Sequence, residues 1–409
     1  MDTRNILFIS YDGMTDPLGQ SQVIPYLQGL SEYGYRFTIL SCEKPARFAL
    51  KRNEIQEILN TCSIKWVPVV YHKTPPVLST LYDVMILKRR AKQLHRAEKF
   101  DMVHTRPGIP SLVGLWMKKK LGVRFLHDVR EFYADSRIDS GIWNYQNPLY
   151  RKIYNYFKKT EKEEIENCDG MVCLTYAAKE IISKLPYYDK HKNIEVIPCS
   201  VDMNLFDPAR ISGEAKEKLK RELNITDQNI VVSYLGSIGG WYLTDEMMQL
   251  CKQVSLEITQ AKFLFISPHA PEIIYRAARK AGMDQNKIIV KNAARNEVPL
   301  LLSLSTYSVF FIKPCFSKRS SSPTKHGEIM AMGIPLITNF GVGDVAEVVE
   351  KYQSGIVLQE LNEEQFQSIP EKLRYDSFDR KVIRNGAREF YDLNNAIEKY
   401  RKVYRVILN

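Results

Sequence analysis

Residues 229–240 read Asn-Ile-Val-Val-Ser-Tyr-Leu-Gly-Ser-Ile-Gly-Gly, a short apolar run that ends in a glycine-rich loop. This pattern is typical of a buried parallel strand that turns into a helix, and a helical stretch starts near Thr244. A similar pattern opens the chain, where the apolar run 5–10 precedes a loop with Gly13, Pro17 and Gly19. Because the strand–loop–helix pattern starts twice, we predict an α/β protein with two Rossmann-like units.

Short apolar runs alternate with helical stretches in both halves of the chain, which predicts doubly wound parallel sheets. The other predicted strands cover residues 35–40, 64–70, 102–105, 124–127, 170–174 and 194–197, and then 262–266, 287–290, 309–312 and 335–338. We expect an N-terminal domain over residues 1–200, a second domain over 201–380, and a helical segment over 381–409 that packs back on the first domain. Ligands of open α/β sheets bind at the carboxyl ends of the strands, so we expect the two domains to face a cleft.

The composition is that of a globular protein, because 44% of the 409 residues are hydrophobic and 26% are charged. It excludes a disulfide-stapled miniprotein, a coiled coil and a mostly disordered chain. The seven cysteines are scattered without a Cys-x-x-Cys pair, which argues against a zinc site and indicates a reducing compartment. No apolar run approaches the roughly 18 residues of a membrane span, and no leader pattern precedes the first strand. We expect a cytoplasmic protein that can lie at the inner face of the cytoplasmic membrane.

The formal net charge is +11, and the excess is concentrated in one region. Residues 44–130 contain 18 basic and 6 acidic residues, a net charge of +12. Two basic runs dominate, and apolar residues precede both: Lys88–Lys92 after Leu81, Met85 and Leu87, and Lys118–Lys120 after Trp116 and Met117. Basic residues beside apolar ones favour docking on anionic lipid, and the alternative is a solvated helix face. Aromatic residues do not interleave with the runs, which argues against a nucleic-acid partner.

The most informative stretch is Ser320–Ile337, which begins Ser-Ser-Ser-Pro-Thr-Lys-His-Gly-Glu. Ser322 can cap a helix that has Pro323 at its first position, where the missing N–H costs nothing. Thr324 and Lys325 would then offer free backbone N–H groups at the positive end of a helix, and Lys325 adds a full charge. This arrangement predicts an anion site, and the alternative is an ordinary capped helix.

The same helix carries a carboxylate on the face of its anion site. Glu328 lies four residues after Thr324, and so on the same side of the helix. A carboxylate at that place can accept hydrogen bonds from a ribose diol while the helix end holds a phosphate. Gly327 would leave room for a ligand near the backbone, and Gly333 is expected to end the helix.

The stretch Ser322-Pro-Thr-Lys325-x-x-Glu328 resembles the donor-binding segment of family 4 retaining glycosyltransferases, which have the GT-B fold. This variant of the segment recurs in enzymes of surface-polysaccharide assembly. In the family, two glutamates spaced eight residues apart flank the helix. Glu328 matches the second, which addresses the ribose, whereas Ser320 stands at the place of the first, which addresses the sugar.

The resemblance extends over most of the chain, through three further segments. Residues 196–206 are similar to the family's interdomain segment, 234–242 to the first strand and loop of its nucleotide-binding domain, and 292–299 to the region that meets the nucleobase. Family members commonly hold the diphosphate with an Arg and a Lys after that first strand, where this chain has Ser237. The resemblance therefore implies that phosphate binding falls mainly to Lys325, with Lys318 and Arg319 as further candidates. The donor-binding residues it implies are Gly19, Gly236, Ser237, Gly239, Ser320, Ser322, Thr324, Lys325 and Glu328.

In the N-terminal half, His127 ends a predicted strand at the place of a family histidine that touches the donor sugar. The alternative is a structural histidine, and His104, which also ends a strand, is the second candidate. The charged loop that follows His127 supplies Arg130 and Asp135 for the acceptor side. The resemblance thus implies His127, Lys325 and Glu328 as the catalytic group.

Together these observations predict a retaining glycosyltransferase that moves a sugar from a UDP- or GDP-sugar to an acceptor hydroxyl on a lipid-linked or growing surface glycan. Protein cations would stabilise the departing diphosphate, and we expect no cofactor and no metal because no carboxylate cluster is apparent. The expected partners are the nucleotide-sugar, the glycan or lipid-linked acceptor and an anionic membrane, without nucleic acid. The alternatives are a GT-B-like sugar-nucleotide epimerase or phosphorylase, and a basic nucleic-acid-binding protein.

Overall fold

The computed structural model describes residues 3–409, which form two compact units. The first unit comprises the chain up to Pro198 together with Leu393–Asn409, and the second comprises Cys199–Asp392. The helical segment predicted from residue 381 is thereby divided. Helix α16 (Arg380–Tyr391) belongs to the second unit, and helix α17 (Leu393–Leu408) belongs to the first.

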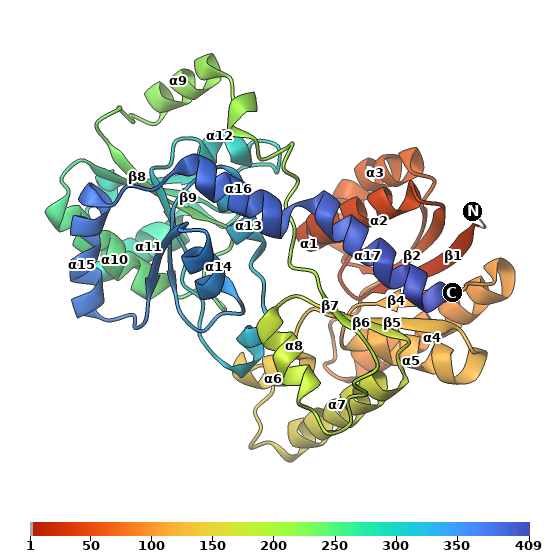
Figure 1. Ribbon diagram of the computed structural model, residues 1–409. Helices are drawn as coiled ribbons and strands as arrows, with labels where there is room; N and C mark the ends of the chain where they lie inside the picture. Colours follow the sequence, from red (N-terminus) through yellow and green to blue (C-terminus); the bar gives the residue numbers. More distant parts are fainter. Residues whose placement is uncertain (1–2) are drawn as a thin grey trace. The chain divides into compact units, whose positions relative to one another are not determined.

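The first unit contains a sheet of seven parallel strands in the order β3-β2-β1-β4-β5-β6-β7 (Figure 1). The central strands are short and almost wholly buried, as expected of a sheet covered on both faces. The strands are β1 (Arg4–Ser10), β2 (Tyr35–Glu43), β3 (Lys65–Val70), β4 (Met102–Thr105), β5 (Arg124–Val129), β6 (Gly170–Cys173) and β7 (Ile194–Val196). The strand order reverses between β1 and β4, where open α/β sheets bind their ligands.

Helices cover both faces of this sheet and bury one apolar core on each. On one face α17 packs against α2, β5 and β6, and buries Tyr400 and Tyr404. On the other face α4, α5 and α7 cover the strands. The helices are α1 (Pro17–Gln22), α2 (Ile24–Ser31), α3 (Pro45–Thr61), α4 (Leu78–Glu98), α5 (Ile109–Leu121), α6 (Tyr133–Asp139), α7 (Pro148–Asn167) and α8 (Tyr176–Ser183).

The second unit has six parallel strands in the order β10-β9-β8-β11-β12-β13, around one continuous apolar core. They are β8 (Ile230–Leu235), β9 (Ala261–Ile266), β10 (Ile288–Lys291), β11 (Tyr307–Val309), β12 (Leu336–Asn339) and β13 (Gly355–Leu358). Besides α16, its helices are α9 (Gly213–Glu222), α10 (Thr244–Glu257), α11 (Pro271–Ala281), α12 (Val298–Leu302), α13 (Thr324–Ala331), α14 (Val345–Lys351) and α15 (Glu363–Tyr375), with short 3₁₀ turns at Pro208–Arg210, Gln285–Lys287 and Phe316–Ser320. The predicted α/β class with two parallel sheets, as in the GT-B fold, is confirmed.

Three local predictions differ from the structure. The predicted strand 309–312 ends early, because the side-chain amide of Asn339 exchanges hydrogen bonds with the backbone of Ile312 in place of the ladder. Strand β13 was not predicted. The predicted helix from about residue 21 is two helices, and α1 begins already at Pro17, so Gly19 lies inside a helix rather than in an open loop. None of the helices within residues 3–409 is long and apolar enough to cross a bilayer.

Candidate functional site

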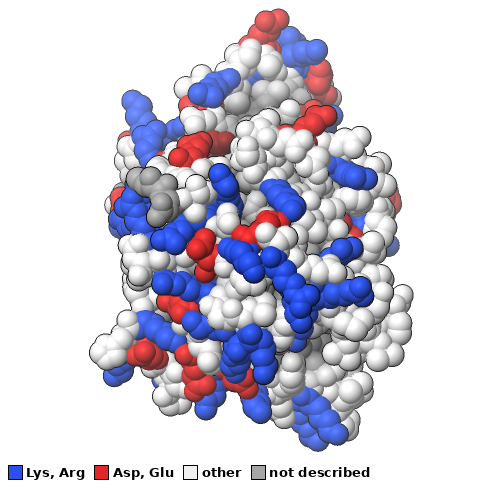
Figure 2. Space-filling view, turned by 90° about the vertical axis from the view of Figure 1, so that its right-hand side faces the viewer, with Lys and Arg blue, Asp and Glu red and all other residues white. Residues whose placement is uncertain are grey.

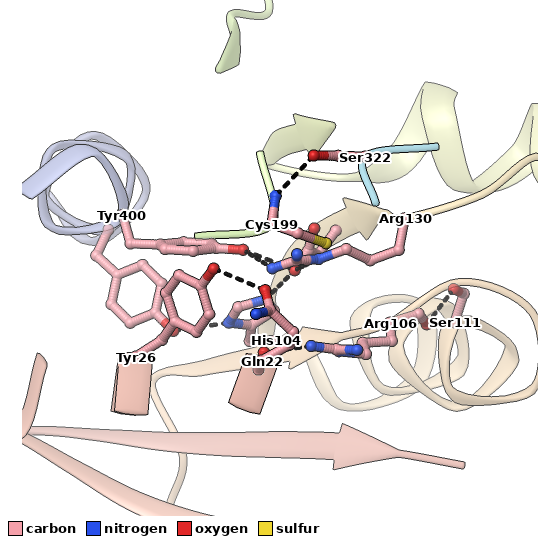
Figure 3. Close-up of polar contacts among 11 residues, drawn as sticks. Gln22, Tyr26, His104, Arg106, Ser111, Arg130, Cys199, Ser322 and Tyr400 are labelled. Carbon is pink, nitrogen blue, oxygen red and sulfur yellow. Dashed lines mark hydrogen bonds and ion pairs between the residues drawn. The ribbon is translucent and has the colours of Figure 1, made fainter. Parts of the chain in front are cut away.

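Helix α13 begins one residue later than predicted. Pro323 has extended backbone (φ −67°, ψ 120°) and precedes the helix, which starts at Thr324. The hydroxyl of Ser322 does not cap the helix but accepts a hydrogen bond from the backbone N–H of Cys199 at 3.1 Å (Figure 3). The first turn of α13 therefore carries no side-chain cap. The N–H of His326 donates to the carbonyl of Pro323 at 2.9 Å, which leaves the N–H groups of Thr324 and Lys325 for an anion.

Lys325 is buried against aromatic rings at the start of this helix. Its Nζ lies 3.2 Å from the hydroxyl of Tyr234 and over the rings of Tyr234 and Tyr242, at 4.3 and 3.7 Å from their centroids. A Cβ built at Gly236 would lie 2.8 Å from the same Nζ, and Gly236 has a φ of +118°, which L side chains rarely adopt. The glycine after β8 thus makes the room that the lysine occupies.

Burial lowers the pKa of Lys325 to about 7, and the more distant Glu328 opposes this shift only weakly. Within residues 3–409, no carboxylate forms an ion pair with the ammonium; a tyrosine hydroxyl and ring faces surround it. An anion beside Nζ would favour the charged form and restore the pKa toward its ordinary range. An anion that bound beside Nζ would therefore be accompanied by uptake of a proton.

Glu328 is buried and paired with a residue that the sequence did not single out. Arg295 donates from Nη1 to Oε1 of Glu328 at 2.7 Å, and its guanidinium lies 5.3 Å from the ring centroid of Phe206. Arg295 lies in the stretch 292–299 that was predicted to meet the nucleobase, and its place in that stretch is the sequence feature that could have identified it as a site residue. The pair holds the Glu328 carboxylate in place while half-exposed Arg295 faces solvent.

The remaining predicted donor residues of this unit lie along the same edge. Tyr234 donates from its hydroxyl to the backbone carbonyl of exposed Ser237, and Gly239 (φ +77°) donates its N–H to the Thr244 hydroxyl at 3.1 Å. Buried Ser320 donates to the carbonyl of Ser317 at 2.7 Å. The structure brings Lys325, Tyr234 and Gly236 together and connects Ser237 to them through Tyr234.

Gly327 on this helix and Lys318 in the 3₁₀ turn before it are both buried in packing contacts. Gly327 does not make room for a ligand, because a Cβ there would lie 3.1 Å from Cβ of Tyr391 on α16; it allows two helices to pack closely. Lys318 is buried, with Nζ 3.7 Å from the ring centroid of Trp241.

In the first unit, His127 lies on the face of β5 that packs toward α7. Its Nδ1 lies 3.4 Å from the Ser111 hydroxyl and its Nε2 lies 3.7 Å from Glu164. Burial lowers the pKa of His127 to about 4, so its imidazole is neutral at pH 7, and burial raises the pKa of the neighbouring Glu164. His127 lines a pocket of about 460 Å³ together with Gly108, Glu131 and Glu164.

The next residue, Asp128, points to the opposite face of β5, as successive strand residues do. Its Oδ2 accepts hydrogen bonds from the Tyr400 hydroxyl at 2.8 Å and from Nε of Arg130 at 3.0 Å, and lies 3.3 Å from His104. Arg130 also donates to Tyr400 at 2.6 Å (Figure 3). His104 is further held by Tyr404 at 2.7 Å. His104 and Arg130 therefore belong to a buried network that attaches α17 to the sheet.

Arg106, which follows β4, is the other residue that the sequence did not single out. It is buried, donates to the backbone carbonyl of Gln22 at the end of α1, and has an Nε without a hydrogen-bond partner (Figure 3). Burial and the neighbouring Arg130 lower the pKa of Arg106. Two arginines and one aspartate thus meet at the strand ends where the sheet order reverses.

Two further predicted residues have structural contacts. Asp135 accepts from the Tyr154 hydroxyl at 2.8 Å and pairs with Lys158 at 3.0 Å, so it attaches α6 to α7. Gly19 is buried inside α1, where a Cβ would collide with the backbone of Gly13 and Met14. Within the described chain, no three His, Cys, Asp or Glu side chains gather as metal ligands would.

With this geometry established, comparisons with known proteins identify the relatives of the chain. The model of the family described as Glycosyltransferase Family 4 matches residues 22–205. The chain is 24% identical over 197 residues to the D-inositol 3-phosphate glycosyltransferase of Segniliparus rotundus, covering 47% of this chain and 41% of that protein. It is 28% identical over 147 residues to the UDP-Gal:alpha-D-GlcNAc-diphosphoundecaprenol alpha-1,3-galactosyltransferase of Escherichia coli, covering 36% and 34%. The matches thus span less than half of these relatives.

Solved structures match over nearly the whole chain. A glycosyltransferase from Rickettsia africae superposes with a TM-score of 0.71 at 16% identity and covers 100% of both chains. Anabaena Alr3699/HepE in complex with UDP-glucose superposes with a TM-score of 0.70 at 13% identity, covering 98% of this chain and 99% of that one. At such identities the likeness establishes the fold.

Proposed function

We propose that the protein is a retaining glycosyltransferase of family 4, the family whose model matches residues 22–205. The donor is a nucleotide-diphosphate sugar held by the second unit, and we assign the acceptor to the first unit. The observation that carries this proposal is the buried Lys325 at the uncapped start of α13. A buried ammonium without a carboxylate partner needs an anion, and a diphosphate supplies one.

The difficult step in such a transfer is the departure of the diphosphate. As the bond between the sugar carbon and the diphosphate oxygen breaks, negative charge develops on that oxygen. The ammonium of Lys325 and the N–H groups of the first turn of α13 are preorganised to stabilise this charge. The acceptor oxygen forms the new bond to the sugar carbon and releases its proton, so the products are the glycoside, the nucleoside diphosphate and one proton. We assign the retained configuration from the family resemblance and name no nucleophile.

Glu328 and Arg295 complete the donor site in this proposal. Glu328 accepts hydrogen bonds from the ribose diol, and the pair with Arg295 at 2.7 Å keeps its carboxylate oriented. Arg295, half-exposed beside Phe206, offers a flat cation to the nucleobase. We propose UDP or GDP as the nucleotide. The UDP in the name of the galactosyltransferase relative supports the first.

On the first unit we assign His127 to the donor sugar and Arg130 to the acceptor side. His127 is neutral at pH 7, so it can donate one hydrogen bond to a sugar hydroxyl without carrying charge. Arg130 presents its guanidinium at the end of β5, fixed by Asp128 and Tyr400. Asp135 is retained only as a residue that positions α6.

We propose a lipid-linked or growing surface glycan as the acceptor and the inner face of the cytoplasmic membrane as the place of transfer. The diphosphoundecaprenol acceptor in the name of the Escherichia coli relative supports this substrate class. The net charge of +12 over residues 44–130 supports attraction to an anionic lipid surface. We assign no cofactor or metal to the reaction, and no nucleic-acid partner.

A thermal-shift screen against nucleoside diphosphates and sugar nucleotides tests the donor assignment, because a ligand that binds only the folded state raises the melting temperature. We expect a shift with UDP- or GDP-sugars, and loss of the shift in Lys325→Met and in Glu328→Ala. Lys252→Met, which changes an exposed lysine of the same unit, is the matched control and should respond like the wild type. If no sugar nucleotide shifts the wild type, or if both site variants respond normally, the assignment is wrong.

A further inference from the structure

The outer face of helix α4 is apolar in its first part and basic in its second part. At about 100° per residue, Leu78, Leu81, Tyr82 and Met85 lie on one side of the helix, and the same side continues into Arg89, Lys92 and Arg96. The four apolar side chains are 64%, 61%, 50% and 58% exposed. The three basic ones are exposed as well. We call these seven residues the outer face of α4.

The inner face of the same helix is firmly attached to the first unit. Ser79, Asp83, Leu87 and Ala91 are buried at intervals of four residues. Asp83 accepts from the Tyr11 hydroxyl at 2.8 Å and from the backbone N–H of His72, whose ring Nδ1 lies 2.5 Å from Oδ1. The helix therefore cannot rotate to bury its exposed leucines, and Leu87, which directly precedes the basic run in the sequence, belongs to the core.

The cations of the outer face have no counter-ions in the described part of the chain. No carboxylate of residues 3–409 forms an ion pair with Arg89, Lys92 or Arg96. The second basic run differs, because Lys118 pairs with Asp169 at 2.6 Å and Lys119 pairs with Glu163 at 2.7 Å. Lys120 is the one lysine of the run on α5 for which the described residues provide no ion pair, so α4 offers the larger unpaired basic surface to an anionic partner.

The wider surface agrees with this. Figure 2 shows the face seen from the right-hand side of Figure 1, where α3, α4 and the two chain ends of the first unit are labelled. Lys and Arg side chains gather on it beside uncharged surface, and Asp and Glu side chains are fewer.

We propose that the outer face of α4 docks on an anionic lipid bilayer, with Leu78, Leu81, Tyr82 and Met85 entering the interface and the basic half contacting lipid headgroups. Transfer of exposed leucine and methionine side chains from water into the lipid interface is favourable in free energy, and a purely ionic partner would not bury them. The cations are attracted by the negative surface potential of the bilayer. A nucleic acid would use the cations but would leave the apolar half in water, so the charge and the apolar stripe together select lipid. The inference bears on where the proposed transfer takes place, but it does not depend on the donor site.

Vesicle co-sedimentation of the full chain tests the docking. The probes are vesicles of phosphatidylcholine alone and vesicles with roughly one third phosphatidylglycerol. We expect binding to the second kind only, weakened by salt. The triple variant Arg89→Gln, Lys92→Gln, Arg96→Gln should bind on the order of a hundredfold more weakly, at about fivefold for each cation removed. Its control is Lys218→Gln, Lys252→Gln, Arg276→Gln, which removes the same charge from exposed sites of the second unit.

The apolar half needs a separate variant. Leu81→Ser with Met85→Ser should weaken binding at least tenfold and leave its salt dependence unchanged, because no cation is lost. Leu256→Ser with Val406→Ser removes side chains that are 64% and 76% exposed elsewhere and should bind normally. Equal binding to neutral vesicles, equal loss in the charge control, or an unaffected Leu81/Met85 variant would each overturn the proposal.

The nucleotide thermal shift is measured on the same samples. A variant that loses vesicle binding but keeps its nucleotide shift is folded, so the loss is specific to docking. If the wild type shows a nucleotide shift without vesicle binding, the docking inference fails and the donor assignment stands. If the wild type binds vesicles but shows no nucleotide shift, the docking inference stands and the donor assignment fails.

Discussion

The pH dependence of donor binding follows directly from the burial of Lys325. Its pKa in the free protein is lowered to about 7, and only the protonated form offers a charge to the diphosphate. The apparent dissociation constant is the intrinsic one divided by the protonated fraction. Between pH 6.0 and pH 8.5 that fraction falls from about 0.9 to about 0.03, so the affinity should fall about thirtyfold.

A sugar nucleotide is the right probe for this measurement. The terminal phosphate of a nucleoside diphosphate titrates near pH 6, whereas both phosphates of a sugar nucleotide are diesters and keep their charge across this range. Isothermal titration calorimetry in buffers of different ionisation enthalpy also counts protons. At pH 8 we expect binding to take up about 0.9 proton, because nearly all of the free lysine is neutral.

Two substitutions separate Lys325 from other titrating groups. Lys325→Arg stays charged throughout the range, so its affinity should be flat and its proton uptake close to zero. Lys325→Met should bind weakly at every pH.

The unfolded lysine binds more protons than the folded one between about pH 7 and its ordinary pKa, so its burial is least favourable at low pH. Lys325→Met should therefore stabilise the free protein more at pH 6 than at pH 9. A flat wild-type profile without proton uptake would refute the reasoning.

Three further predictions concern single positions. Arg295→Ala should weaken donor binding about tenfold or more, measured by calorimetry, because it removes a charge-assisted hydrogen bond to Glu328; normal affinity would contradict its place in the site. Gly236→Ala should destabilise the protein by about 1–3 kcal/mol in urea unfolding, since alanine there needs a strained φ and meets the Lys325 side chain, whereas Gly213→Ala has open space and should be neutral. Tyr400→Phe should cost about 1–3 kcal/mol of stability because it removes a buried hydrogen bond to a carboxylate, and an unchanged urea midpoint would show that α17 does not depend on it.

Features carried by neighbouring residues were predictable from the sequence. The apolar run before Gly236 identifies a buried strand because a strand that is covered on both faces has apolar residues at consecutive positions. The Ser322–Glu328 motif predicts the start of a helix, and α13 begins within it, because a helix start and its first turn are local structures. The restart of the pattern at residue 229 likewise predicts two sheets, and both are present.

Features that join distant residues could be decided only by the tertiary structure. Arg295 and Glu328 form a hydrogen bond although they are 33 residues apart in the sequence, and Tyr400 and Asp128 are 272 residues apart. Nothing in the sequence around one partner indicates the other. The sequence places Leu81, Met85 and Leu87 together before the basic run, but only Leu87 is buried, because the direction in which α4 packs decides which of them join the core.

The chemistry of Lys325 shows the division most clearly. The sequence by itself places a lysine at the start of a helix after a serine–proline pair, which is enough to predict a cation near an anion site. Only the tertiary structure surrounds that lysine with Tyr234, Tyr242 and the space left by Gly236, and so removes it from water. The pKa of a side chain depends on its solvation and on the charges around it. Both are set by packing between segments that lie far apart in the chain.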